Sequence, residues 1–263
     1  MSRTYDVVVV GAGAAGFAAA KAARGADSNA SILLVNGEGY PPYDRTQLSK
    51  SIADGFSVDN LLLESDEWFV SHAVERSDAT TVQAIERDKK AITTPDDSVG
   101  YGALVLALGS QPIFPKLVRP HERGSFYVVR NASDAIEFRT RAKKARTVLV
   151  AGMGVLAVEL AQQLIAMKKE VTLAGATPQL MPRQLTPRAG ELLEEAMTKR
   201  KVKLLFQEEI LSFEQNKKRS WSVEMLKHSA HYDMVVFCIG VEPITELARS
   251  CGLTVERGIV VDG

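Results

Sequence analysis

One arrangement occurs twice in this 263-residue chain, about 140 residues apart: a buried strand, a glycine turn and a helix. Tyr5–Val10 is rich in β-branched residues, which predicts a strand of the kind that parallel sheets bury on both faces. Gly11–Gly16 follows at once, then an alanine-rich helix over Phe17–Ala23 and a second buried strand over Ser31–Val35. The order strand, turn, helix, strand within about 30 residues predicts a βαβ unit.

The second copy has the same order. It comprises a strand over Thr147–Ala151, a turn over Gly152–Gly154, a helix over Val155–Met167 and a strand over Glu170–Leu173. The repeat predicts a doubly wound α/β fold with two Rossmann-like dinucleotide-binding domains, the second inserted into the first. We expect the first domain to comprise residues 1–115 and 234–263, and the inserted domain residues 116–233.

Weaker periodic signals predict the remaining elements, with Asn131 or Ser133 as the cap of one helix. The predicted helices are Leu61–Phe69, Asn131–Lys144 and Pro187–Arg200, and the predicted strands are Val82–Ile85, Ala91–Thr94, Leu104–Leu108, Val202–Phe206, Trp221–Leu226 and Met234–Ile239.

Composition excludes some functions. Lys+Arg and Asp+Glu both total 32, so no basic excess favours nucleic acid or an acidic membrane. No window reaches the roughly 18–20 apolar residues of a membrane span, and the N-terminus lacks secretory-signal features. We therefore expect a cytoplasmic protein. The two cysteines and four histidines form no metal motif, so no metal site is predicted.

The first glycine turn has the spacing of a dinucleotide site. In such turns Gly11 permits the tight bend, Gly13 lets the backbone approach a pyrophosphate, and Gly16 lets the helix pack closely on the strand. Ala14 and Ala15 lie within the turn, and the start of the helix that follows offers free N–H groups that favour negative charge. The second turn repeats this with Gly152, Gly154, Val155 and Leu156, and Ala157 replaces the third glycine. Two such turns predict two dinucleotides and hydride transfer between them.

Four further motifs resemble one family. Residues 42–50 (PYDRTQLSK) are similar to a PYxRxxLSK loop, and residues 107–112 to an ATGSxP turn with Leu108 in place of threonine. Residues 152–159 match GxGxxxxE, and residues 237–243 match the strand and turn that return to the flavin domain. In this order the motifs resemble the FAD-dependent pyridine nucleotide-disulfide oxidoreductases, in particular the ferredoxin-reductase and apoptosis-inducing-factor-like branch.

The resemblance implies FAD on the first turn, NAD(P)H on the second, and an NAD(P)H-dependent flavoprotein reductase. It implies that Arg45 contacts the FAD pyrophosphate and that Lys50, paired with Glu159, lies beside the flavin ring as the catalytic pair. Glu38 would bind ribose hydroxyls, and Val82 would offer backbone contacts to adenine. The complete set of expected cofactor contacts is Gly11, Gly13, Ala14, Ala15, Gly16, Glu38, Arg45, Lys50, Val82, Ala107, Leu108, Gly109, Gly152, Gly154, Val155, Leu156, Glu159 and Gly240.

The electron acceptor is expected to be external. No CxxxxC motif follows the first turn, and Ser49 and Ser51 stand where related enzymes carry a redox cysteine. Cys238 lies in a predicted buried strand, as a small core residue would. A small iron–sulfur protein and a small oxidant are both candidates for the acceptor, and a homo-oligomer or a completing subunit is open.

Two departures leave alternatives. An acid that binds ribose normally ends the second strand of each unit, but Gly37 and Gly175 occupy those positions. Glu38 adjoins the first, whereas no acid follows the second and Arg183 is the only nearby arginine, so NAD and NADP both remain open. The relatives also continue beyond the segment that resembles residues 252–263. A fragment, a site completed by a partner, and a truncated nucleotide-binding module without turnover are therefore alternatives.

Overall fold

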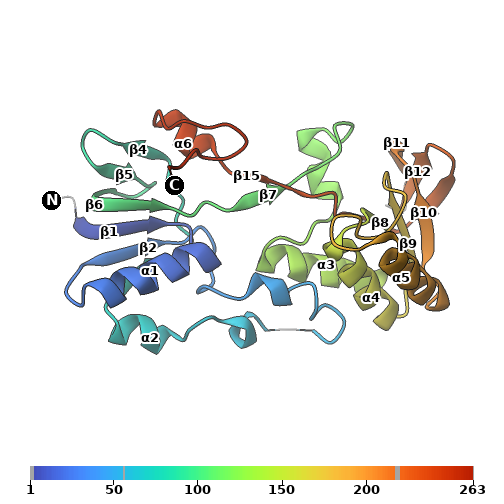
Figure 1. The fold of residues 1–263 in the computed structure, drawn as a ribbon, viewed down its shortest axis with the longest axis horizontal. Helices are drawn as coiled ribbons and strands as arrows, with labels where there is room; N and C mark the ends of the chain where they lie inside the picture. Colours follow the sequence, from blue (N-terminus) through green and yellow to red (C-terminus); the bar gives the residue numbers. More distant parts are fainter. Residues whose placement is uncertain (1–2, 56, 217–219, 263) are drawn as a thin grey trace. The chain divides into compact units, whose positions relative to one another are not determined.

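The computed structural model describes residues 3–55, 57–216 and 220–262. The chain divides into two compact units, each made of stretches that are separate in sequence (Figure 1). Unit 1 comprises Met1–Asp44, Ser57–Gln111 and Glu242–Gly263, and unit 2 comprises Arg45–Phe56 and Pro112–Val241. Within the described residues, no helix is both long and apolar enough to span a bilayer.

Unit 1 is built on a six-stranded sheet in the order β3-β2-β1-β6-β5-β4. The first four strands are parallel, and β5 and β4 continue the sheet antiparallel. The order 3-2-1 followed by a crossover is that of one half of a Rossmann fold. The strands are β1 (Thr4–Val10), β2 (Ile32–Val35), β3 (Val74–Ser77), β4 (Ala84–Glu86), β5 (Ala91–Thr93) and β6 (Ser98–Leu106).

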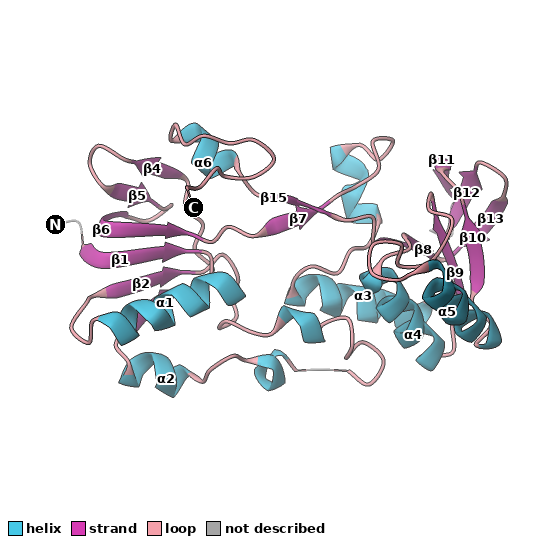
Figure 2. Cartoon of the chain, in the orientation of Figure 1, coloured by secondary structure: helices cyan, strands magenta, loops and turns pink. Residues whose placement is uncertain are grey.

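Helices cover both faces of this sheet. Helices α1 (Ala14–Ala26) and α2 (Asp66–Ser71) share a core with one face, where Phe17 and Phe69 pack among the alternate residues of β1 and β2. The opposite face packs against α6 (Glu246–Ser250) through Leu247. Burial on both sides explains why β1 and β2 read as near-continuous apolar runs. Figure 2 shows α1 lying along the strands that flank it in sequence.

Arg24 fastens the carboxyl end of α1. Its guanidinium donates to four backbone carbonyls, those of Asp27 (3.0 Å), Ala30 (2.6 Å), His72 (2.6 Å) and Ala73 (3.0 Å). We expect Arg24→Met to lower the free energy of unfolding by about 1–2 kcal/mol, because four carbonyls from two separate stretches of the chain lose one shared charged donor. Urea unfolding followed by circular dichroism measures the change.

The matched control for Arg24→Met is Arg3→Met. Arg3 forms an ion pair with Glu75 in which the two side chains are 70% and 51% exposed. An exposed pair of this kind contributes about 1 kcal/mol or less. Equal losses in the two variants would contradict the fastening role of Arg24.

Unit 2 contains a four-stranded parallel sheet in the order β10-β9-β8-β14. Its strands are β8 (Thr147–Ala151), β9 (Glu170–Gly175), β10 (Lys203–Phe206) and β14 (Met234–Phe237). Its helices are α3 (Ala132–Lys144), α4 (Val155–Ala166) and α5 (Pro187–Lys199). Asn131 is the N-cap of α3 and forms a capping box with Asp134, which decides between the two caps considered from the sequence.

A separate antiparallel sheet in unit 2 joins β11 (Ile210–Gln215), β12 (Trp221–Met225) and β13 (Ser229–Tyr232). It packs on the parallel sheet through an aromatic core in which Phe126 stacks on Trp221 with ring centroids 4.4 Å apart, and Phe237 lies beside them. Two short strands, β7 (Ser110–Pro112) and β15 (Val241–Pro243), pair with each other. Each contains a point at which the chain passes from the residues of one unit to those of the other. Among the described residues, the loops contain the 3₁₀ turns η1 (Arg45–Gln47), η2 (Val58–Leu61) and η3 (Pro120–Ser125).

Some sequence expectations need correction. The strand at Met234–Phe237 pairs with β8 in unit 2, because its apolar side chains complete that parallel sheet, so the expected boundary at residue 234 falls too early. The helix expected over Leu61–Phe69 starts only at Asp66, since Leu62 forms a bridge with Tyr43. The strand expected over Leu104–Leu108 begins at Ser98 and ends at Leu106.

Candidate dinucleotide sites

The first glycine turn lies between β1 and α1, as the sequence predicts. Gly11 has φ +102°, and a Cβ there would stand 2.2 Å from the carbonyl oxygen of Ala107. A Cβ on Gly16 would stand 1.7 Å from the carbonyl oxygen of Gly11. Both positions therefore need glycine for close backbone approach, at the turn for Gly11 and at the helix–turn contact for Gly16.

The start of α1 is open to an anion. Gly13 is the N-cap, no side chain caps the helix, and its first turn carries no acidic residue. Ala14 and Ala15 are exposed. Uncapped N–H groups and the positive end of the helix dipole suit a phosphate.

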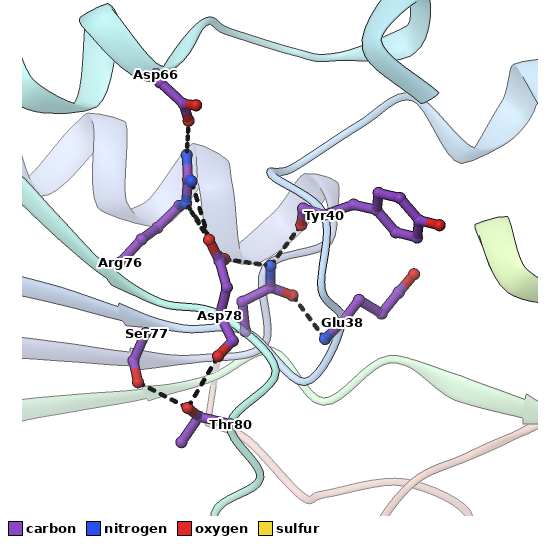
Figure 3. Close-up of polar contacts among 8 residues, drawn as sticks. Glu38, Tyr40, Asp66, Arg76, Ser77, Asp78 and Thr80 are labelled. Atoms are coloured by element: carbon purple, nitrogen blue, oxygen red, sulfur yellow. Dashed lines mark hydrogen bonds and ion pairs between the residues drawn. The ribbon is translucent and has the colours of Figure 1, made fainter. Parts of the chain in front are cut away.

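A polar network holds the loop that follows β2. Asn36 is buried, and its amide nitrogen donates to the carbonyl of Tyr40 (2.6 Å) and to Asp78 (2.7 Å). Its amide oxygen accepts from the N–H of Glu38 at 3.1 Å. Asp78 in turn pairs with Arg76 (Figure 3). The network fixes the backbone of Glu38 at the carboxyl ends of β2 and β3, beside the glycine turn, where Gly11 donates to the carbonyl of Val35.

Glu38, which the sequence analysis proposes for ribose recognition, follows directly after Gly37 in this loop. It accepts a hydrogen bond from the hydroxyl of Tyr43 at 2.7 Å. Tyr43 belongs to the PYDRTQLSK loop, so this loop and the strand-end acid meet within unit 1. Sequence reasoning proposed Glu38 as a ribose ligand, which stays a prediction, and it missed Asn36 and Asp78 because nothing in the local sequence marks their pairing.

Other predicted contacts of unit 1 also gather at this end of the sheet. Ala107 donates to the carbonyl of Val10, and Gly109 has φ +73° and accepts from Ile244. Leu108 packs against the core face that contains Val82, whose side chain is 8% exposed. The cofactor contacts expected of these residues stay predictions.

The second part of the PYDRTQLSK loop, from Arg45 onward, belongs to unit 2. Residues 45–55, which include the 3₁₀ turn η1 (Arg45–Gln47), belong to that unit and make polar contacts with it. Arg45 donates to the carbonyl of Arg130 at 3.2 Å, and Arg139 donates to the carbonyl of Ile52 at 2.9 Å. The expected domain boundaries placed this segment in the first domain, and the structure corrects that because its polar contacts are with α3 and α4.

Helix α4 holds this segment through two side chains on one face. Glu159 accepts from the hydroxyl of Ser49 at 2.6 Å, and Gln163 accepts from the N–H of Ala53 at 2.8 Å. Positions four apart share a helix face, which explains why both reach the same segment. The structure therefore gives Glu159 a different partner from the Lys50 expected, whereas Lys50 itself is exposed.

The second glycine turn repeats the geometry of the first. Gly152 has φ +141°, donates to the carbonyl of Ala174 at 2.8 Å, and would bring a Cβ to 2.4 Å from the carbonyl oxygen of Cys238. Gly154 is the N-cap of α4, and no side chain caps this helix either. Val155 is 41% exposed at its start, and Ala157 is fully buried where the third glycine would stand. Leu156 is half-buried on the same turn.

Strand β14 ends beside this turn. Burial of its sulfur raises the pKa of the Cys238 thiol to about 12, so it is protonated near neutral pH. Gly240 follows with φ +119° and accepts from the N–H of Ile113 at 3.0 Å.

A buried acid lies near the same strand ends. Glu208 is 3% exposed, and its carboxylate accepts from the N–H of Lys227 at 3.0 Å and pairs with His228 Nδ1 at 2.5 Å. Burial by itself would raise the pKa of Glu208, but these hydrogen bonds outweigh it and hold the pKa below its ordinary value of 4.5.

This lowered pKa predicts an acid-sensitive contribution to stability. The stabilisation is present above the unfolded-state pKa and is lost as pH falls through the lower folded-state pKa. We expect Glu208→Gln to be less stable than the unaltered chain at pH 7, and to lose stability less steeply below about pH 4.5. Urea unfolding at several pH values measures both, with the exposed Glu214→Gln as control. If the free energy of unfolding fell equally steeply with decreasing pH in Glu208→Gln and in the unaltered chain, the prediction would be contradicted.

Together the two units define an α/β protein with two Rossmann-type βαβ sites, each with an uncapped helix start at a glycine turn. Residues 5–263 match the family model described as pyridine nucleotide-disulphide oxidoreductase. The chain belongs to this family, which confirms the resemblance inferred from the motifs and the predicted fold class.

Relatives of known role are longer than this chain. It is 29% identical over 258 residues to the ferredoxin–NAD(+) reductase subunit of a benzene 1,2-dioxygenase system from Pseudomonas putida, covering 97% of this chain and 62% of that protein. It is 26% identical to an NADH-rubredoxin oxidoreductase from Clostridium acetobutylicum, covering 99% and 64%. The chain thus spans less than two thirds of the length of these relatives.

Solved structures agree in fold. A ferredoxin reductase from Rhodopseudomonas palustris superposes with a TM-score of 0.89 at 25% identity, covering 97% of this chain and 64% of that one. The reductase in a covalent putidaredoxin reductase–putidaredoxin complex superposes with the same score and identity, covering 98% and 63%.

Proposed function

We propose that this chain is the two-nucleotide part of an NAD(P)H-dependent flavoprotein reductase that passes electrons to an external acceptor. The observation that carries the proposal is the pair of glycine turns, each opening an uncapped helix at the carboxyl end of a parallel sheet. Membership of the oxidoreductase family supports the same reading.

The residues of unit 1 fit FAD. The turn from Gly11 to Gly16 leaves room and free amides for a pyrophosphate, and Glu38 offers a carboxylate for ribose hydroxyls. When bound, the flavin would accept hydride from a nicotinamide and release electrons to an acceptor. Outside unit 1, the motif resemblance assigns two more residues to FAD: Arg45, whose planar cationic fork suits phosphate oxygens, and Lys50, whose charge would lie near the flavin ring.

The residues of unit 2 fit a nicotinamide dinucleotide. Gly152 and Gly154 present the amides of the α4 start, with Val155 and Leu156 following. Glu159 acts on Ser49 and so would position the segment that carries Lys50. The chain's own contribution is then binding, orientation and charge.

Absorbance spectroscopy tests the proposal. The purified chain, reconstituted with FAD, should show a flavin spectrum that NADH or NADPH bleaches under nitrogen. We expect Lys50→Met to retain FAD and to slow this reduction by about tenfold or more, since one charge-stabilising group typically contributes at least that much. Lys199→Met, at the far end of α5, is the control.

A colourless chain that binds dinucleotides but oxidises neither NADH nor NADPH would instead favour a nucleotide-binding module without turnover. With turnover present, the acceptor is identified by comparison of small iron–sulfur proteins with oxygen and nitrite. We favour an iron–sulfur protein, because relatives bear the names of ferredoxin and rubredoxin reductases. A cytoplasmic location stays part of this proposal.

A further inference from the structure

A cavity of about 480 Å³ opens at the carboxyl ends of β8 and β9 in unit 2. Its volume is within the range of small-molecule sites. Three of its aliphatic side chains are unusually exposed: Leu117 at 39%, Leu211 at 49% and Ile239 at 41%. The lining is Pro115, Lys116, Leu117, Ala151, Ala174, Gly175, Ala176, Glu208, Glu209, Ile210, Leu211 and Ile239.

The cavity adjoins the second glycine turn. Ala151 lines it and directly precedes Gly152, and the carbonyl of Ala174 accepts the N–H of Gly152. In a βαβ unit the adenosine half of a dinucleotide extends from the turn across the ends of the first two strands. The aliphatic walls suit an adenine ring, because covering them removes apolar surface from water.

The strand end itself lacks the expected ribose ligand. Gly175 ends β9 where an acid normally stands, and a Cβ there would lie 2.9 Å from Met153 Cγ. Two acids instead come from the connection after β10. The N–H of Glu208 donates to the carbonyl of Gly175 at 3.0 Å, so this connection runs directly beside the strand end.

Only one of these two glutamates has a carboxylate that is available to a ligand. Glu208 is buried and committed to His228 and to the N–H of Lys227. Glu209 is exposed, and within the described part of the chain its carboxylate makes no hydrogen bond or ion pair. To bind a ligand hydroxyl, an exposed carboxylate in the lining exchanges hydrogen bonds to water and breaks none within the protein.

We propose that Glu209 binds the adenosine ribose hydroxyls in place of the missing strand-end acid and thereby selects NADH over NADPH. This rests on the proposed function of unit 2. A 2′-phosphate would bring its negative charge against Glu209, which disfavours NADPH. Arg183, the arginine considered from the sequence, does not line the cavity. Lys116 is the basic residue in the lining.

Calorimetric titration of the FAD-loaded chain with NAD⁺ and NADP⁺ tests this assignment without turnover. Glu209→Gln should weaken NAD⁺ binding by about tenfold, the scale of one charged hydrogen bond, and leave NADP⁺ binding unchanged or tighter. Glu214→Gln, an exposed acid of β11 outside the cavity, should change neither. Unaltered thermal unfolding of both variants confirms that they fold.

Three results would overturn the assignment. If Glu209→Gln leaves both affinities unchanged while the unaltered chain binds NAD⁺, Glu209 is not the ribose ligand, and the proposed function stands. If the unaltered chain prefers NADP⁺ and Lys116→Met abolishes that preference, the cavity binds the 2′-phosphate of NADP⁺ through Lys116 instead. Binding of neither nucleotide to the unaltered chain defeats the proposed function and this inference with it.

Discussion

Gly16→Ala is expected to lower the free energy of unfolding by about 3 kcal/mol or more and to abolish retention of FAD. On the unaltered backbone, a Cβ at residue 16 would lie 1.7 Å from the carbonyl oxygen of Gly11 and 3.2 Å from Ala107 Cβ, so atoms must move to make room for it. Backbone atoms cannot rotate away as a side-chain tip can, so α1 must separate from β1 or the turn must distort. Urea unfolding measures the first effect, and the flavin content of the purified protein measures the second.

Gly25→Ala is the matched control for this prediction. Gly25 lies in the same helix, and a Cβ there would meet nothing within 4 Å. Alanine has the higher helix propensity, so stability should stay the same or rise by up to about 1 kcal/mol. If Gly16→Ala were as stable as Gly25→Ala, the close contact between helix and turn would not constrain the fold as described.

Asn36→Ala is expected to cost about 2–4 kcal/mol of unfolding free energy, since it leaves buried backbone groups without partners. The side chain joins the Tyr40 carbonyl, the Glu38 N–H and Asp78 in one buried network. Its loss should also weaken FAD binding, because the loop that carries Glu38 is no longer fixed. Urea unfolding and fluorimetric titration with FAD measure the two effects.

Asp66→Ala serves as control for Asn36, because Asp66 belongs to the same polar chain at its outer end. It pairs with Arg76 at 2.8 Å, but its side chain is 71% exposed. Removal of an exposed ion-pair partner should cost about 1 kcal/mol or less. A loss for Asn36→Ala no greater than that for Asp66→Ala would show that the loop holds its shape without Asn36.

The sequence predicted the central parallel strands well because their signal is local. Thr147–Ala151 is found as expected, and the helix start at Val155 and the strand start at Glu170 also agree. By contrast, β3 and β13 were not predicted. Their sequences, VERS and SAHY, are short and largely polar, and both strands lie at sheet edges where one neighbour supplies the pairing. Such strands are defined by tertiary contact more than by their own residues.

Some features of the candidate sites could likewise be predicted from the local sequence, and others could not. The glycine positions could be predicted because a turn of this type requires small residues at fixed spacing. The partner of Glu159 could not, since Ser49 lies 110 residues away and its neighbour Lys50 was the more obvious choice by charge. Likewise, the pairing of Asn36 with Asp78 spans 42 residues and leaves no local trace.

The contribution of residues 45–56 to unit 2 has a practical consequence for dissecting the protein. A continuous piece covering only residues 112–241 would be missing Leu48 and Ile52, which the full chain buries to 1% and 0% exposure. It would also leave Gln163 and Glu159 without their partners in residues 45–55 and expose apolar surface on α4, the helix to which both belong. Such a piece should aggregate, whereas fusion of residues 45–56 to it through a flexible linker should restore a well-behaved domain.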